Sequence, residues 1–384
     1  MRGILFVTLI VSTLARAGDT TVMTRLLQRV QMLQPKNSEI FPKGSIPAYR
    51  RYALNGNTEK ADVNAFFTGL VVFTLKDLKP DLSVTQQRLA NDIIADCLPA
   101  FDKFKSRRGK PSYNFWPTDT PRIFPNSGWL NLFDKSQQLP DDLDDTAIML
   151  LAEQANDSTA KAVHALMQLY ANNERKKVNN TFKEYRTIGA YSTWFGKKMP
   201  VDFDVCVLTN ILYFVQSYHL TWTAADSASL QFITRVIADR RHITDAAYVS
   251  PHYSRLPNIL YHLSRLMALK PTPALEQYRP QLIADAKEAL LHAASFMDEV
   301  ILGTSLLRWG AEPPSTAPRE ANSLTDLVEE ERFSFFIASM ASILPDGLKK
   351  TLNGVGKFYY FSPAYNNILL LENLVWRQRR GLPL

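Results

Sequence analysis

Apolar residues recur at helical spacing along most of the chain, and polar residues occupy the positions between them. This pattern predicts an amphipathic helix over residues 18–35, an almost wholly apolar helix over Ala65–Leu78 and a third helix from Ser83 to about Lys105. Further helices are predicted over Thr159–Asn172, Asp204–Tyr218, Ala224–Asp239, Ser254–Leu269, Pro280–Phe296, Leu324–Leu344 and Tyr365–Arg380. Because no run of alternating apolar and polar residues is bounded by hairpin turns, we predict an all-α chain.

Short blocks of sequence recur along the chain and indicate a repeated helical unit. Asn-Ile-Leu begins at residues 210, 258 and 367, and the block Tyr-X-Ser-Pro-X-Tyr begins at residues 248 and 360. A unit of about 50 residues, made of a loop, an inward helix, a turn and an outward helix, fits this spacing. Such pairs either stack openly or close into a ring, and an open stack would expose inner helices that are apolar nearly all round. We therefore predict a single domain over residues 18–384 that forms a closed α/α toroid.

Aromatic residues gather where loops lead into the predicted inner helices. The stretch from residue 106 to residue 141 is rich in Phe, Tyr and Trp and is broken by Pro and Gly, so no helix crosses it. Core packing would account for each aromatic residue taken singly. Taken together, their placement predicts an apolar pocket at one end of the ring, with these candidates for substrate binding: Trp116, Trp129, Tyr191, Trp194, Tyr248, Tyr253, Tyr360 and Tyr365.

The beginning of the chain has the pattern of a secretory signal peptide. Met1-Arg2-Gly3 precedes the apolar run Ile4–Leu14, and Ala15-Arg16-Ala17 follows as a cleavage site. We therefore expect residues 1–17 to be removed after Ala17, and the mature protein to be secreted, periplasmic or lumenal.

Charge and cysteine content narrow the classes of partner and fold. The formal net charge of +7 is spread along the chain in short basic runs between apolar segments, so no nucleic-acid groove is expected. The positive balance leaves peripheral association with an anionic membrane surface open, and the oligomeric state is not indicated. Cys97 and Cys206 both lie in apolar helical stripes, so we predict two buried, unbridged thiols.

Four carboxylates lie within five residues, at Asp141, Asp142, Asp144 and Asp145, directly before an apolar helical run. Asp residues at this position are ordinary helix caps, and capping alone explains them without any chemistry. If the carboxyls face a cavity, however, like charges this close cannot all ionise, so one keeps its proton near neutral pH. A carboxyl that stays protonated can act as a general acid.

The run Asp142-Leu143-Asp144-Asp145-Thr146-Ala147 resembles the protonating motif of class II terpene cyclases. In that family the middle Asp protonates an alkene or epoxide, and the resemblance therefore implies that Asp144 is the general acid. It also implies that Asp142 and Asp145, with Asp141 beside them, tune that acid. The α/α toroid is the fold of these cyclases and of protein prenyltransferase β subunits. The function implied is proton-initiated cyclisation or isomerisation of a small hydrophobic, isoprenoid-like substrate.

Two other classes of protein fit the same residues. An exported carbohydrate-active (α/α) barrel, a hydrolase or lyase, would use paired carboxylates, such as Asp141 or Asp144 with Asp204, to cleave a glycan. A non-catalytic toroid would use the aromatic pocket to bind a hydrophobic ligand. His252, which precedes a predicted inner helix, is a candidate for a hydrogen bond that adjusts the pKa of one of the carboxyls.

A metal site is considered and not expected. Asp204-Val205-Cys206 and His262 resemble the zinc ligands of protein prenyltransferases, but a helix cap and two core residues explain the same letters. The sequence also contains no Gly-rich phosphate loop, no serine nucleophile elbow and no His-Glu-X-X-His motif. We therefore expect no metal and no cofactor.

Overall fold

The computed structural model describes residues 21–52, 59–107, 109–120, 122, 139–196, 199–316, 323–330, 333–339, 344, 346–352 and 356–382. The expected signal peptide over residues 1–17 and the candidate residue Trp129 lie outside these ranges. Within them the chain is mostly helical, and the described helices include none with the length and apolar character needed to cross a membrane.

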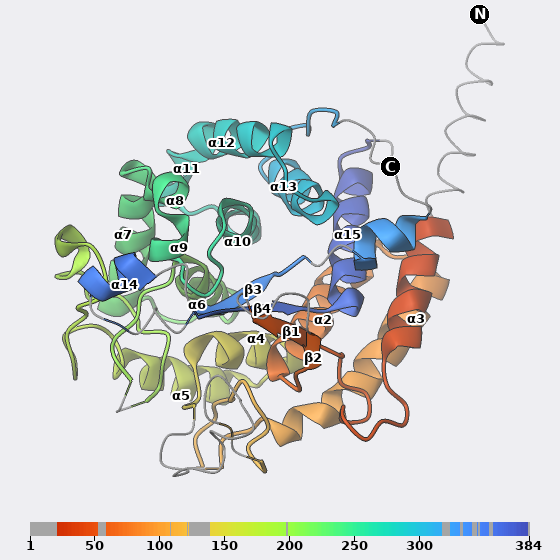
Figure 1. The fold of residues 1–384 in the computed structure, drawn as a ribbon, viewed down its shortest axis with the longest axis horizontal. Helices are drawn as coiled ribbons and strands as arrows, with labels where there is room; N and C mark the ends of the chain where they lie inside the picture. The colour runs from red at the N-terminus through yellow and green to blue at the C-terminus, as the bar shows by residue number, and fades with distance from the viewer. Residues whose placement is uncertain are drawn as a thin grey trace, which may run out of the picture.

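Six helices form the interior of the molecule. They are α2 (Ala65–Leu78), α4 (Leu143–Glu153), α6 (Val205–Ser217), α10 (Leu256–Leu269), α13 (Phe296–Arg308) and α15 (Pro363–Arg379). Each packs against the next in this order, and α15 packs against α2 (Figure 1). These helices bury residues on nearly every side, which follows from their apolar composition and shields their backbones from water.

The remaining long helices lie outside the first six and are amphipathic. They are the helical residues 21–33, α3 (Val84–Cys97), α5 (Asp157–Gln168), α7 (Ala224–Ala238) and α12 (Arg279–Leu291). In α5 the buried residues are Ala160, Val163, His164 and Met167, which is one face of a helix. Short helices complete the fold: α8 (Arg241–Thr244), α9 (Ala246–Val249), α11 (Pro273–Glu276), α14 (Asp346–Leu352), a π-helical turn η6 (Asp326–Glu330), and the 3-10 segments η1 (Lys79–Asp81), η2 (Leu98–Lys103) and η5 (Lys183–Tyr185).

The N-terminal ends of the inner helices meet at one end of the molecule. The segment before α10 contacts the first turn of α4 through Tyr253 and Asp144, and the N-cap of α6 through His252 and Asp204. Arg255, which precedes α10, pairs with Asp298 in the first turn of α13. This arrangement gathers the loops that precede the inner helices, as the sequence predicts.

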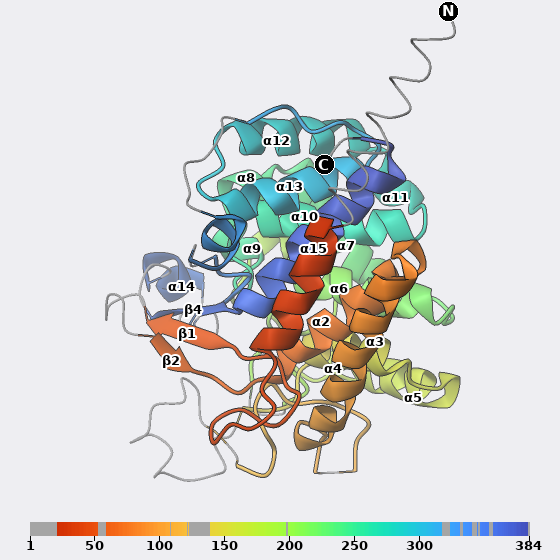
Figure 2. The same cartoon turned by 90° about the vertical axis from the view of Figure 1, so that its right-hand side faces the viewer.

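A four-stranded antiparallel sheet lies at this same end (Figure 2). The strand order is β2 (Glu59–Ala61), β1 (Tyr49–Tyr52), β4 (Lys357–Phe361) and β3 (Phe336–Ser339). Tyr49 is opposite Phe361 in the central pair, and Phe336 is opposite Tyr360 in the outer pair. The all-α prediction is confirmed in its coarse form, since the described chain is mostly helical, but the small sheet was not predicted. Strands of only 3 to 5 residues contain too few positions to show a period of two.

The predicted helices agree with the structure except near residues 296–344. The helix predicted over Leu324–Leu344 was wrong, since helical turns end at residue 330 and Phe336–Ser339 is strand β3. The predicted helix Pro280–Phe296 ends earlier, at Leu291, and a separate inner helix α13 follows. Ser295 caps α13 by accepting a hydrogen bond from the Asp298 amide, a capping pattern that was readable in the sequence.

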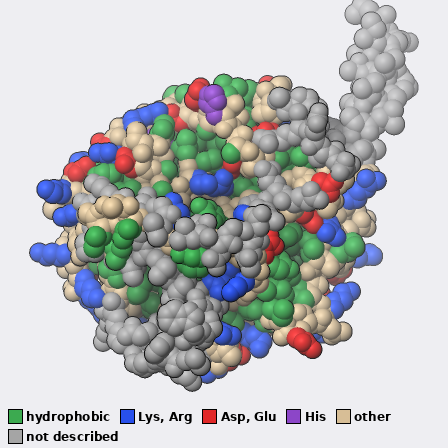
Figure 3. Space-filling model, viewed as in Figure 1, with side chains coloured by type: hydrophobic (Ala, Val, Ile, Leu, Met, Phe, Trp, Pro, Cys, Tyr) green, Lys and Arg blue, Asp and Glu red, His purple; other side chains and the backbone are tan. Residues whose placement is uncertain are grey.

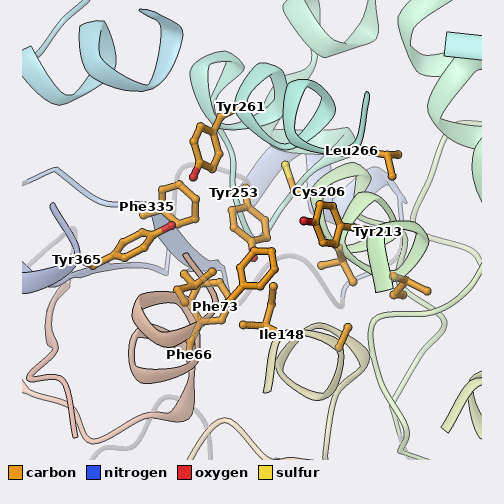
Figure 4. Packing of buried hydrophobic residues seen from close by; sticks show 14 of the residues in the cluster. Phe66, Phe73, Ile148, Cys206, Tyr213, Tyr253, Tyr261, Leu266, Phe335 and Tyr365 are labelled. Carbon is orange, nitrogen blue, oxygen red and sulfur yellow. The ribbon is translucent and has the colours of Figure 1, made fainter. Parts of the chain in front are cut away.

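Both cysteines are buried and free, which confirms the prediction for Cys97 and Cys206. Around Cys206 the interior is filled by aromatic side chains that converge from several inner helices, among them Phe73, Tyr213 and Tyr261 (Figure 4). On the surface, Lys and Arg side chains are spread around the face that Figure 3 shows, and hydrophobic side chains lie between them.

Candidate active site

Asp142, Asp144 and Asp145 are placed by the first turn of α4 and are all buried, with exposed fractions of 6%, 5% and 2%. Asp142 is the N-cap: its carboxylate accepts a hydrogen bond of 2.7 Å from the backbone amide of Asp145. The capping interpretation is therefore correct for Asp142. It does not account for Asp144 and Asp145, whose side chains are buried beyond the cap.

Asp144 is held by residues from two other inner helices and the segment before one of them. Asn210 on α6 donates its side-chain N–H to one carboxylate oxygen at 2.6 Å. The Tyr253 hydroxyl, just before α10, donates to the other oxygen at 2.5 Å. Arg265 on α10 donates to the Asn210 side-chain oxygen at 2.5 Å, which fixes the orientation of that amide. The three residues form a chain of donors that ends on Asp144.

The three carboxyls have different affinities for a proton. Burial raises the pKa of Asp144 to about 6, while the hydrogen bonds from Tyr253 and Asn210 oppose that rise. Burial raises the pKa of Asp142 to about 7 and, with the adjacent charge of Asp142, raises the pKa of Asp145 well above its usual value. One oxygen of Asp145 is buried without a hydrogen-bond partner among the described residues, as expected for a carboxyl that carries a proton. The raised pKa values of Asp142 and Asp145 therefore favour a proton shared by this pair beside Asp144.

A second set of carboxylates lies at the start of α6. Asp202 contacts the Nε2 atom of His252 at 2.8 Å, and burial leaves both side chains almost without solvent contact. Burial disfavours the charged imidazole, but the hydrogen bond and charge of Asp202, together with the charges of Asp204 and Asp142, raise the pKa of His252. The raised pKa favours the charged form of His252, and that charge would partly balance the nearby carboxylates.

Asp204 is a structural cap and not a free carboxylate. It accepts hydrogen bonds from the amides of Cys206 and Val207, from the Ser250 hydroxyl at 2.7 Å and from the His252 amide at 2.8 Å. Burial raises the pKa of Asp204, although His252 and these donors oppose the effect. With four donors on two oxygens, Asp204 has little capacity left for a substrate.

Aromatic side chains enclose the carboxyl cluster. The backbone of Trp194 pairs with that of Asp142, and the Trp194 ring meets the His252 ring edge-on with centroids 5.7 Å apart. Phe336 of β3 stacks on His252 at 6.2 Å and contacts Tyr253 at 5.9 Å. The Ile337 amide also donates to the His252 carbonyl at 2.8 Å, which ties β3 to this loop.

Phe335, Tyr360 and Tyr365 extend the aromatic wall inward from this strand. The Phe335 ring lies 5.9 Å from Tyr253 and 5.1 Å from Tyr365. Tyr360 of β4 meets the Phe336 ring at 5.4 Å. The candidates Trp194, His252, Tyr253, Tyr360 and Tyr365 are therefore brought to the carboxyl cluster, directly or through β3.

Three of the predicted aromatic residues lie away from the carboxyl cluster, and Asp141 lies at its edge. Tyr191 binds Asp226 at 3.0 Å between outer helices, and Trp116 donates to Asp62 at 3.0 Å below the sheet. Tyr248 packs against Phe182 at 4.6 Å, and Asp141 accepts a hydrogen bond from Ser112 at 2.7 Å at the edge of the cluster. These contacts are structural, and they do not support a role in substrate binding for Trp116, Tyr191 or Tyr248.

The sequence prediction missed Asn210, Arg265 and Asp202. It also missed Phe336 of β3 and Phe335 directly before it. Asn210 begins one of the recurring Asn-Ile-Leu blocks, and a buried amide in an apolar helix was a usable sign of a hydrogen-bonding role. Arg265 lies in α10, a helix that we interpreted as apolar, and a charged residue in such a helix was an equally usable sign of a buried polar contact. Phe335 and Phe336 were assigned to a helix, so their position at the cluster could not be anticipated.

The zinc interpretation has no support from these contacts. Asp204 is occupied by its donors, burial raises the pKa of the Cys206 thiol well above its usual value, and His262 Nδ1 bonds to the Asn258 carbonyl at 2.7 Å. Among the described residues no three metal-ligating side chains lie close enough together to hold an ion.

Comparison of the chain with protein-family models, with curated proteins and with solved structures found no match.

Proposed function

We propose that this chain is an α/α toroid enzyme of the class II terpene cyclase type, which donates a proton from Asp144 to an isoprenoid-like substrate. The packing order α2, α4, α6, α10, α13, α15 and back to α2 supports the closed ring of helices. The observation that carries the activity is the environment of Asp144, a buried carboxyl with a pKa of about 6 next to aromatic rings.

The proposed chemistry needs only groups of this chain. Asp144 gives its proton to one carbon of a substrate double bond, so a C–H bond forms and the π electron pair leaves a carbocation on the neighbouring carbon. Tyr253 and Asn210 already donate to both oxygens and so stabilise the carboxylate that remains. Tyr253, Phe336 and Phe66 pack against one another beside Asp144, and in this proposal their aromatic rings stabilise the positive charge.

The Asp142–Asp145 pair acts as the proton store in this proposal. At pH 7 a carboxyl with a pKa of about 6 is protonated in about a tenth of molecules, so Asp144 alone is a weak reserve. Asp142 and Asp145 keep a proton at higher pH and return it to Asp144 after each turnover. Loss of a proton from the carbocation to solvent or to a carboxylate completes an isomerisation or cyclisation.

The alternative of a carbohydrate-active enzyme needs two carboxylates that reach a substrate, and Asp204 is poorly suited to be one of them. Asp204 is saturated by donors, and a glycosidase acid or nucleophile needs a carboxyl that reaches its substrate. A toroid that binds a hydrophobic ligand without chemistry keeps the same aromatic wall, and only an activity measurement distinguishes it from the enzyme.

The test is incorporation of deuterium into an acyclic isoprenoid. The protein is incubated in D₂O with geranylgeraniol or squalene, and the extracted products are analysed by gas chromatography and mass spectrometry. We expect a product with one carbon-bound deuterium from the parent and from the surface control Asp157→Asn, and none from Asp144→Asn. Retention of an unlabelled ligand without product by all three proteins would favour the binding toroid, and cleavage of a glycan would favour the carbohydrate class.

A further inference from the structure

A cavity separate from the carboxyl cluster opens beside Trp194. Its volume is about 380 Å³, which is within the range of sites for small organic molecules. The walls combine aromatic and apolar side chains with cations, and they consist of Tyr170, Ala171, Arg175, Lys176, Ser192, Trp194, Gly196, Met199, Pro200 and Val201. Among the described residues, no carboxylate contributes to this lining.

Positive charge is concentrated on one wall. The guanidinium of Arg175 lies 4.7 Å from the centre of the Tyr170 ring, and Lys110 lies 5.7 Å from the same ring. Lys110 also donates to the Tyr170 hydroxyl at 3.3 Å, and Lys176 reaches the Met199 carbonyl at 2.9 Å. The two cations stacked on Tyr170 have no carboxylate partner in these contacts, so an anion entering the cavity would meet uncompensated positive charge.

The rest of the lining offers an apolar surface. Trp194, Met199, Pro200 and Val201 contribute an indole ring and aliphatic side chains there, which suit an apolar or aromatic body.

We propose that this cavity is a binding site for a small anionic amphiphile, a molecule with an apolar or aromatic body and one negatively charged group. The charged group lies against Arg175 and Lys176, and the body lies between Tyr170 and Trp194. The inference rests on the cavity residues alone, and its test measures binding without turnover, so it stands or falls separately from the acid chemistry proposed for Asp144.

The experiment uses two probes of equal shape and different charge. Binding of 2-naphthoate and of the neutral 2-naphthamide is measured by isothermal titration calorimetry with the intact protein. We expect 2-naphthoate to bind more tightly and to lose affinity as salt is added, because exposed charge–charge attraction is screened. Arg175→Gln should weaken binding of 2-naphthoate by about threefold to tenfold and leave binding of 2-naphthamide unchanged.

Lys177→Gln is the matched control, since Lys177 is an exposed cation of the same basic run but is not part of the cavity lining. We expect it to bind both probes as the parent does, whereas Tyr170→Leu should weaken both. Equal affinity for the two probes, equal losses in Arg175→Gln and Lys177→Gln, or no saturable binding in the millimolar range would each overturn the proposal.

Discussion

Asp142, Asp144 and Asp145 are neighbours in the sequence, but each carboxyl has different surroundings. Asp142 accepts a backbone amide, Asp144 accepts two side-chain donors, and Asp145 has an oxygen with no partner in the described chain. Burial and the neighbouring carboxylates raise the pKa of Asp145 well above its usual value, and Asp145 is also the residue with the fewest donors. In the proposed mechanism Asp144 is the acid and this neighbour resupplies its proton.

At this scale we predict that Asp145→Asn makes the protein more stable at alkaline pH. The pKa values of Asp142 and Asp145 are raised from the usual 3.8, so the folded state keeps protons that the unfolded state has released. Stability from these groups is therefore present at low pH and falls as the pH rises from about 4 through about 7. Asn keeps the shape and a donor for Asp142 but does not ionise.

Chemical denaturation at two pH values measures this effect. The free energy of unfolding of Asp145→Asn should exceed that of the parent by about 1–3 kcal/mol at pH 8 and match it below about pH 4. Asp157→Asn, an exposed first-turn residue of α5, serves as the control and should change little at either pH. A loss of stability at pH 8 would contradict the proposed shared proton.

We also predict that Arg265 sets the pKa of Asp144 through Asn210. Arg265→Met removes both the donor to Asn210 and the buried positive charge, so the pKa of Asp144 should rise above about 6. Infrared titration of the carboxyl C=O band, with Asp144→Asn to assign it, reads this pKa directly. Arg279→Met, which breaks a surface pair with Glu276, should leave the titration unchanged. An unchanged Asp144 titration in Arg265→Met would remove Arg265 from this role.

Residue pairing explains what the sequence could and could not predict about the site. The carboxyl motif and His252 were visible because they are local, with a recognisable spacing or a place before an inner helix. Tyr253 and Asn210 reach Asp144 across 109 and 66 residues of sequence. Such contacts depend on how the inner helices pack together, which no local sequence pattern specifies. Trp116 and Tyr191 were wrongly placed because an aromatic residue in the sequence does not show which polar group its side chain will bind in the fold.

Among the elements, α6 has an N-cap that also binds another part of the chain. Asp204 receives two amides of its own helix and two further donors from the loop before α10. The cap thus joins α6 to this loop, and removing it leaves several buried donors without a partner.

We predict that Asp204→Ala lowers the free energy of unfolding by about 3–5 kcal/mol. Asn156→Ala is the matched control, because Asn156 caps α5 at an exposed site by accepting from the Thr159 amide. That variant should lose about 1 kcal/mol in the same urea titration. Similar losses in the two variants would show that the loop contacts of Asp204 contribute nothing.

Strand β3 shows why one element was misassigned. Its four residues, Phe336–Ser339, are apolar or small and follow helical turns, so their local pattern continues a helix. Pairing with β4 and the hydrogen bond from Ile337 to the His252 carbonyl decide the outcome, and both partners are distant in sequence. Tertiary pairing therefore overrides local preference at the strand that closes the candidate site.

For the whole molecule, the contact between α15 and α2 closes the circuit of inner helices. A chain that ends at Phe361 lacks α15 and exposes the apolar faces of α2 and α13. We predict that this truncation abolishes the cooperative thermal transition seen by circular dichroism. The intact protein should scatter as a compact particle with a radius of gyration near ~21 Å. A truncated chain that melts cooperatively at the parent temperature, or an elongated parent, would argue against a closed ring.

The pairing of β1 with β4 has a consequence for how the protein is made. Tyr49 meets Phe361, so a ribosome has synthesised almost the whole chain before β1, which already has β2 on one side, can pair with β4 on the other. Contacts between such distant segments form slowly, and the growing chain stays open in the meantime. Because β3 is hydrogen-bonded to β4, and Ile337 of β3 to His252, the sheet beside the candidate site also forms only when most of the chain has been made.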